Sequence, residues 1–185
     1  MSKINAGFLP QSSIKELSAA VFKFYLDLAK EKLNDLGCTS VKVEYSGEGE
    51  SERTKNVIFT PAVDVESVKN SLFDVGYIHC VFDEIAKKWG YVVIETPRDL
   101  TLLIQDFCCK SLLASGNKDY SHGNGGGGTF SINVQTGAVQ LAHYKNGVER
   151  EYSTFSINPQ TGEASRETPE EDADAAETAP AAPSA

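Results

Sequence analysis

The chain has 185 residues, of which 41% are hydrophobic and 23% charged, and its formal net charge is −9. These values are ordinary for a soluble globular protein, and the length favours one domain over two. The acidic balance disfavours free nucleic acid as a ligand, because affinity for phosphates depends on clustered lysine and arginine. No apolar run is long enough for a membrane span, and residues 1–20 lack the pattern of a secretory signal, so we expect a cytoplasmic protein.

The first predicted element is a helix over residues 13–36, preceded by a flexible arm over residues 1–11. Ser13 and Glu16 have the spacing of a capping box, and Gly37 stands where a helix needs a left-handed C-terminal residue. Between them, apolar residues recur at steps of three and four along one helical face: Ile14, Leu17, Val21, Phe24 and Leu28.

A predicted hairpin follows the helix. Residues 41–45 alternate between apolar and charged side chains, which is typical of a half-buried strand, and residues 57–60 form a second short apolar run before Pro61. The polar segment SGEGESERTKN at 46–56 is then expected to be a long acidic hairpin tip.

Residues 64–89 predict a second helix, with Asp64 and Ser67 as its cap and Gly90 after its last turn. Its proposed apolar face comprises Val68, Leu72, Val75, Ile78, Val81, Phe82 and Ile85. Residues 91–96 are expected to be a buried strand. Pro97 suits the first turn of a third helix that runs to about Ser115. That helix carries Leu100, Leu103, Ile104, Phe107 and Leu112.

Three alternating segments, 129–134, 138–145 and 150–157, predict an antiparallel meander with tight turns at QTG and NG. Residues 129–138 recur at 154–163 with eight of ten residues identical. Two copies are too few for a solenoid, so we interpret them as equivalent strands on either side of one partner. Residues 159–185 are acidic and rich in Ala and Pro, and are expected to be disordered. The prediction is therefore one α+β domain over 12–158, with about three helices packed on an antiparallel sheet that ends in a three-stranded meander.

Two segments resemble binding loops. The glycine-rich run at 123–128 can cradle a phosphate in principle. However, no Lys-Ser or Lys-Thr follows it and it leads into a predicted strand, which favours a flexible connector. Glu48, Glu50 and Glu52 alternate like the start of a calcium loop, but the closing acidic residue is missing, which favours a solvated hairpin tip without metal.

The cysteines and histidines indicate no catalytic centre. The four cysteines, Cys38, Cys80, Cys108 and Cys109, are expected to be reduced and buried, and none is spaced as CxxC. A Cys–His nucleophile pair can use any of His79, His122 and His143, because such partners meet in space. His79 and Cys80 are neighbours on a predicted helix and so point apart. His122, beside the glycines, is expected to be the exposed histidine.

Two stretches, LNDLGCTSVKVEYSGEGES (33–51) and HGNGGGGTFSINVQTGAVQLAHYKNGVEREYSTFSI (122–157), together resemble a family of uncharacterised bacterial proteins with a domain of unknown function. That family has a VxVEYxGxGxS strand and loop, and a later His-Gly…Gly-x-Phe meander. The matching positions are Gly37, Val41, Val43, Glu44, Tyr45, Gly47, Gly49, Ser51, His122, Gly123, Gly128, Phe130 and Gly137. The family's tryptophan and acidic residues after His-Gly are glycines here, and its strand-loop aspartate is Glu50. The resemblance implies an α+β fold and no particular activity.

These patterns favour a non-enzymatic protein-interaction module, such as an inhibitor, an immunity-type protein or an accessory protein of a mobile element, with no cofactor and no metal. Its candidate contacts are Glu48, Glu50, Glu52, His122 and Gly123, which would meet a protein partner with a basic surface because complementary charge steers association. The alternative is a small-ligand or nucleotide-binding protein, or an enzyme, that uses the His122 glycine-rich loop.

Overall fold

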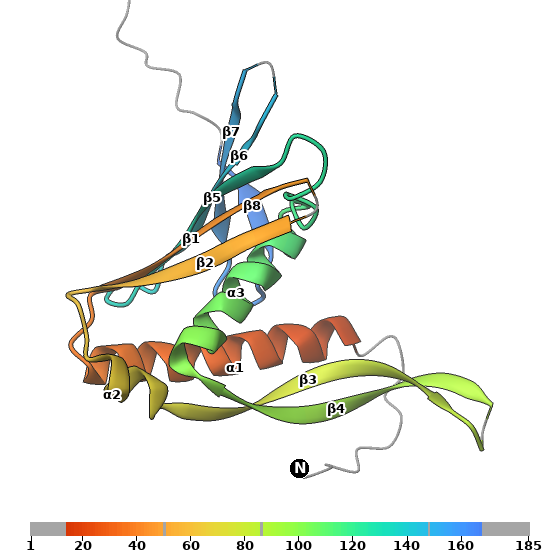
Figure 1. Ribbon diagram of the computed structural model, residues 1–185. Helices are drawn as coiled ribbons and strands as arrows, with labels where there is room; N and C mark the ends of the chain where they lie inside the picture. The colour runs from red at the N-terminus through yellow and green to blue at the C-terminus, as the bar shows by residue number, and fades with distance from the viewer. Residues whose placement is uncertain (1–13, 50, 86, 148, 168–185) are drawn as a thin grey trace, which may run out of the picture.

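The computed structural model describes residues 14–49, 51–85, 87–147 and 149–167 (Figure 1). In chain order the elements are α1 (Ile14–Asp35), β1 (Ser40–Glu48), β2 (Ser51–Thr60), α2 (Val65–Lys69), β3 (Leu72–Asp83), β4 (Lys88–Asp99), α3 (Leu100–Ala114), β5 (Gly126–Asn133), β6 (Val139–Lys145), β7 (Glu151–Ile157) and β8 (Ala164–Arg166). The predicted α+β class is confirmed, and so is the meander near the C-terminus.

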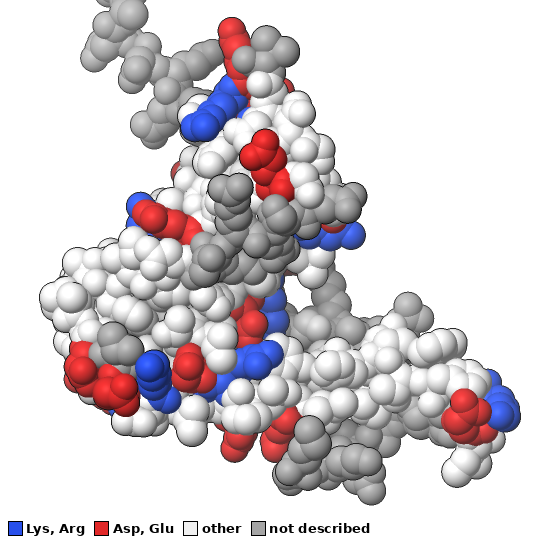
Figure 2. All heavy atoms as spheres, viewed as in Figure 1, with Lys and Arg blue, Asp and Glu red and all other residues white. Residues whose placement is uncertain are grey.

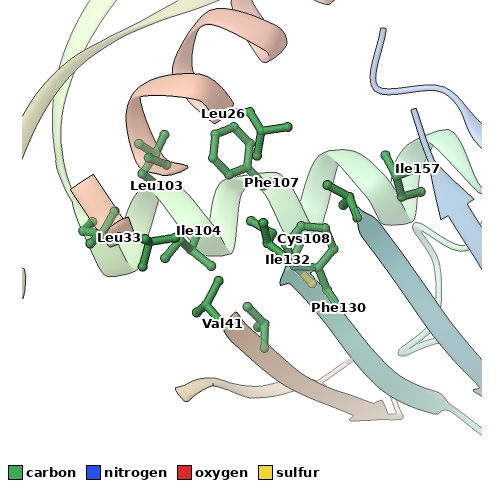
Figure 3. Close-up of a cluster of buried hydrophobic side chains, with 14 of the residues drawn as sticks. Leu26, Leu33, Val41, Leu103, Ile104, Phe107, Cys108, Phe130, Ile132 and Ile157 are labelled. Carbon is green, nitrogen blue, oxygen red and sulfur yellow. The ribbon is translucent and has the colours of Figure 1, made fainter. Parts of the chain in front are cut away.

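The main body is a six-stranded antiparallel sheet with the strand order β2-β1-β5-β6-β7-β8, and helices α1 and α3 lie against one of its faces (Figure 1). Inward-facing residues of β1, β5, β6 and β7 pack on both helices, with Phe107 of α3 at the centre of the cluster (Figure 3). Phe107 meets Phe22 of α1 edge to face, with ring centroids 5.3 Å apart. Burial of this apolar surface is the main stabilising contribution to the body.

The expected face of the first helix is wrong by about one residue. The buried stripe of α1 consists of Phe22, Leu26, Ala29 and Leu33, whereas Phe24 is exposed. The apolar residues of α1 are too evenly spread for the pattern to select one face, so packing on α3 decides it. The helix ends as predicted: Gly37 adopts φ +72°, and Cys38 N donates to Leu33 O at 2.8 Å. Ser13 lies outside the described residues.

The predicted hairpin over 41–60 is confirmed, but its tip is short. Strands β1 and β2 pair as far as Glu48 and Ser51, so most of the polar segment 46–56 belongs to the two strands. Polar residues suit these positions because β2 is the edge of the sheet.

The predicted helix over 64–89 is wrong. Only residues 65–69 are helical, capped as expected by Asp64, whose side chain accepts from Ser67 N at 2.9 Å. Residues 72–83 form β3, which pairs along its whole length with β4 as a separate two-stranded sheet. We call this hairpin the arm. Apolar residues lie on both faces of β3. Their spacing along the chain therefore includes steps of three and four residues, which is also the spacing of a helical face.

The strand expected at 91–96 exists as part of β4, but it is not buried: Ile94 is exposed and β4 pairs only with β3 among the described strands. Pro97 lies within β4 rather than at the start of a helix. The cap of α3 is Asp99, whose side chain accepts from Leu102 N at 2.8 Å. The five expected core residues of α3 are all buried.

The repeated segments occupy equivalent places on either side of β6, as predicted. Phe130 and Phe155 both pair with Leu141. Each copy ends in the same turn, in which Gly137 and Gly162 adopt φ +74° and +73°. The second turn leads into β8, which pairs with β7. The expectation of disorder from residue 159 onward is therefore wrong for residues 159–167, because a short returning strand needs little apolar sequence at a sheet edge.

Candidate functional site

The structure brings three of the predicted contact residues to one end of the main sheet. Glu48 ends β1, and the loop that carries His122 and Gly123 lies beside it: a Cβ added to Gly125 would lie 2.9 Å from the Cα of Glu48. His122 is exposed, as expected, and its carbonyl accepts from Gly125 N at 3.1 Å. Glu50 lies outside the described residues, and so does the side chain of Glu52.

The glycine-rich run is not a flexible connector where it reaches the sheet. Gly126, Gly127 and Gly128 begin β5, where they pair with β1 on one side and β6 on the other. Their backbone groups therefore serve the sheet, which leaves this part of the run unsuited to cradle a phosphate. The glycines are required by space: a Cβ on Gly127 would lie 2.7 Å from the hydroxyl oxygen of Tyr144, and one on Gly128 would lie 2.8 Å from that of Tyr45.

Beneath these glycines lies a buried polar pair. The hydroxyl of Tyr45 and Nδ1 of His143 are 3.0 Å apart, and the two rings are stacked. His143 is only 4% exposed, and its Nε2 has no hydrogen-bond partner among the described residues. Burial, together with the charge of Lys145, lowers the pKa of His143 to about 4, although the Gly127 backbone opposes the shift. Burial also raises the pKa of Tyr45 strongly. Both groups are therefore neutral near pH 7.

His79 and Cys80 do not form a catalytic pair. His79 and Cys80 are adjacent on β3, where successive side chains point to opposite faces. The expectation of buried thiols holds for Cys38 and Cys108 but not for Cys80 and Cys109, which are exposed. Within the described ranges, no cluster of three or more His, Cys, Asp and Glu side chains is arranged to hold a metal ion. None of the described helices is long and apolar enough to cross a membrane.

Sequence reasoning missed the most distinctive surface, which is the arm. Its base is held by both long helices. Tyr25 of α1 donates to Asp74 O at 2.6 Å and accepts from Gly76 N at 3.0 Å. On α3, Asp106 accepts hydrogen bonds from Tyr77 and from Arg98, the latter at 3.2 Å from Nε. Burial and the Asp106 hydrogen bond raise the pKa of Tyr77 to about 12. These contacts orient the arm, which then extends beyond the body (Figure 1).

The outer part of the arm exposes large apolar side chains. Trp89 is 69% exposed and Phe82 is 40% exposed, and their rings are 5.4 Å apart on opposite strands. Ile85 in the turn is 96% exposed. On the face seen in Figure 2, acidic and basic side chains gather at the tip of the arm, and the described surface in this view between the tip and the body carries no charged side chain. An exposed aromatic pair on a two-stranded ribbon is typical of a contact surface.

A pocket of about 530 Å³ lies on the face of the main sheet opposite the helices. Tyr144 and Tyr152 line it as neighbouring rings with centroids 6.0 Å apart, and the Arg150 guanidinium lies 4.8 Å from the Tyr144 ring centroid. Glu44, Asn56, Thr129 and Thr154 supply polar groups to its wall. The sequence signal for this pocket was the alternation of polar and apolar residues along β1, β2, β5 and β7. Residues two apart in a strand share a face, so the polar positions of these strands lie on the same side of the sheet.

Comparison of the chain with protein-family models, with curated proteins and with solved structures finds no match. The resemblance of residues 33–51 and 122–157 to a family of uncharacterised bacterial proteins therefore stays a prediction.

Proposed function

We propose that this protein is a non-enzymatic interaction module that contacts a protein partner through its arm. The observation that carries the proposal is the exposed Phe82–Trp89 pair on a ribbon that belongs to neither face of the main sheet. Burial of exposed apolar area in a complex favours association, and the part of that gain that exceeds the entropic cost of binding appears as affinity. The hydrogen bonds of Tyr25 and Asp106 preorganise the arm for contact, which lowers the entropic cost of binding.

Residues 89–94 in the middle of the arm carry no charged side chain, so they do not favour a basic partner. The hypothesis of a basic partner rests on Glu48 at the end of β1, with the neighbouring acidic residues of the sequence. A partner that also reached this end would gain in association rate from complementary charge.

The test is retention by immobilised protein, comparing the wild type with the F82S/W89S variant. The matched control is I58S/L102S, which removes two exposed apolar side chains from β2 and α3. We expect a protein retained by the wild type and by the control to be lost with F82S/W89S, while circular dichroism shows all three folded. Equal retention by F82S/W89S and the wild type would contradict the proposal.

A second candidate is a small-ligand binding protein that uses the pocket lined by Tyr144 and Tyr152. Two aromatic rings beside hydroxyl, amide and carboxylate groups suit a small polar molecule with one apolar face. A ligand screen by thermal shift tests this hypothesis: a stabilising compound should lose its effect in Y144A/Y152A and keep it in F82S/W89S.

A further inference from the structure

We infer that the partner of the arm is a second copy of this chain, joined by antiparallel pairing of β4 with β4 about a two-fold axis at Tyr91. The inference rests on the proposed function in that the arm is the contact surface. It adds the identity of the partner and the register of the contact.

The hydrogen bonds of Tyr25 establish which backbone groups of the arm face outward. Asp74 O and Gly76 N bond Tyr25, so the even-numbered residues of β3 direct their backbone groups away from β4. In an antiparallel pair, residues opposite one another either exchange hydrogen bonds or both face outward. The β4 partners of Ile78, Cys80 and Phe82 therefore also face outward, and these are Val93, Tyr91 and Trp89.

Pro97 fits this assignment independently. It pairs with Asp74, at an outward-facing position, where the missing N–H of proline costs the arm no hydrogen bond. The outer edge of β3 lies beside α1, which supplies Tyr25. The outer edge of β4 lies on the side away from α1 (Figure 1), and no described strand pairs with it.

Between Lys88 and Glu95, this edge lacks the features that protect exposed strands from pairing, and Pro97 lies beyond that stretch. From Trp89 to Ile94 it reads WGYVVI, with no proline and no charged residue. Natural edge strands of this length are usually interrupted by charge, proline or a bulge, because unpaired backbone groups recruit another strand. The register between β3 and β4 shows no bulge.

The register of self-pairing follows from the outward positions 89, 91, 93 and 95. A two-fold axis at Tyr91 places Trp89 opposite Val93 of the second copy. An axis at Val93 would instead place Glu95 opposite Tyr91, and Pro97, which lacks a donor, opposite Trp89. The first register pairs an aromatic with a β-branched side chain twice, which is a favourable cross-strand combination.

Charge favours the same register. With the axis at Tyr91, Glu95 of one copy reaches the turn that precedes β4 of the other, where Lys87 lies next to the first residue of the strand, at both ends of the contact. Lys87 is exposed and bonds Glu84 at 2.9 Å in the turn, so its side chain remains at the rim. No two like charges oppose one another between these ends. The contact is isologous and closes as a dimer.

Sedimentation over a range of protein concentrations tests the association. We expect a reversible dimer for the wild type and for Y91V, which keeps the outward N–H, and a monomer for Y91P, which removes it. Hydrogen exchange should show that the arm of Y91P still protects the amides of Val92 and Ile94, which face β3. A wild type that stays monomeric at every accessible concentration would overturn the inference, as would a Y91P variant that dimerises like the wild type.

A short bis-maleimide reagent tests the register in a C80S/C109S background. We expect Y91C to be linked to itself, because the two residues face each other across the axis. V93C should not be linked to itself, because its two copies would lie about 13 Å apart at 3.3 Å per residue. A mixture of V93C with W89C should be linked. A dimer in which V93C is linked to itself and Y91C is not would have another register, and the inference would fail.

The two proposals fail separately. If the wild type is monomeric but F82S/W89S loses a retained protein, then the arm binds a different chain and the proposed function stands. If F82S/W89S changes neither retention nor association, both fail.

Discussion

The hydroxyl of Tyr25 lies between two backbone groups of β3, accepting from Gly76 N at 3.0 Å and donating to Asp74 O at 2.6 Å. One side chain thus takes the place of a neighbouring strand at the base of the arm. The same bonds identify the outer edge of β3 and, through the register, that of β4. The two hydrogen bonds of Tyr25 anchor the base of the arm to α1.

Replacing Tyr25 by Phe should destabilise the base of the arm. The N–H of Gly76, which is buried, would lose its partner, and we expect the free energy of unfolding to fall by about 1–3 kcal/mol. Urea unfolding measures the loss, and hydrogen exchange at the Gly76 amide should accelerate. Y152F, at an exposed tyrosine, is the control and should change stability by less than about 0.5 kcal/mol. Equal stability of Y25F and Y152F would contradict the anchoring role.

Acid should destabilise the protein through His143. Its pKa is lowered from 6.5 to about 4 by burial, so the folded chain keeps it neutral while the unfolded chain takes up a proton. The free energy of unfolding is therefore unaffected by the titration of His143 above pH 6.5, and it decreases as the pH falls from 6.5 toward 4. The slope for one proton is about 1.4 kcal/mol per pH unit.

The matched variant for this prediction is H143Q, whose side-chain amide can donate or accept a hydrogen bond with Tyr45 but does not titrate. Denaturation between pH 7 and pH 4 should show a shallower loss of stability for H143Q than for the wild type. Parallel pH profiles for the two proteins would show that His143 is not held neutral by the fold.

Alanine at Gly128 should be strongly destabilising. Its Cβ would lie 2.0 Å from the carbonyl oxygen of Ala142, so the ladder between β5 and β6 must shift. We expect a loss of at least about 2 kcal/mol. G37A should lower the free energy of unfolding by about 1 kcal/mol. A Cβ at position 37 would meet no atom within 4 Å, so only the positive φ of Gly37 opposes the substitution. Thermal unfolding of the two variants should reveal this order, and a reversed order would contradict the packing role of the glycine run.

The four thiols should react in two classes. Cys80 and Cys109 are exposed, whereas Cys38 and Cys108 are buried. A thiol reagent should therefore label two groups quickly in the native protein and the other two only after denaturation. Fast labelling of all four in native buffer would contradict the described core.

Local patterns predicted much of the body. The capping chemistry of Asp64, the left-handed Gly37 and the TFSIN strands on either side of β6 all followed from residues close in the chain. The buried face of α1 did not, because apolar residues surround much of that helix. The strand β8 was also missed, since its stability comes from pairing with β7 rather than from its own composition.

The arm shows the same division most clearly. The apolar residues from Leu72 to Ile85 match a helical period, but Gly76 and the β-branched residues at 75, 78 and 81 suit a strand once residues 88–99 are available as a partner. Of the predicted contacts, Glu48, His122 and Gly123 do lie at one end of the sheet, whereas the arm carried no recognisable motif.

The sequence by itself determined the α+β class, the meander and the turns, because hydrophobic period, glycine placement and capping act over a few residues. Only the tertiary structure decided which face of α1 is buried, why the glycines at 126–128 are needed, and that residues 72–99 project as an arm with an unpaired edge. These depend on contacts between residues distant in the chain, such as Tyr25 with Gly76 and Tyr45 with His143, whose energies no local pattern records.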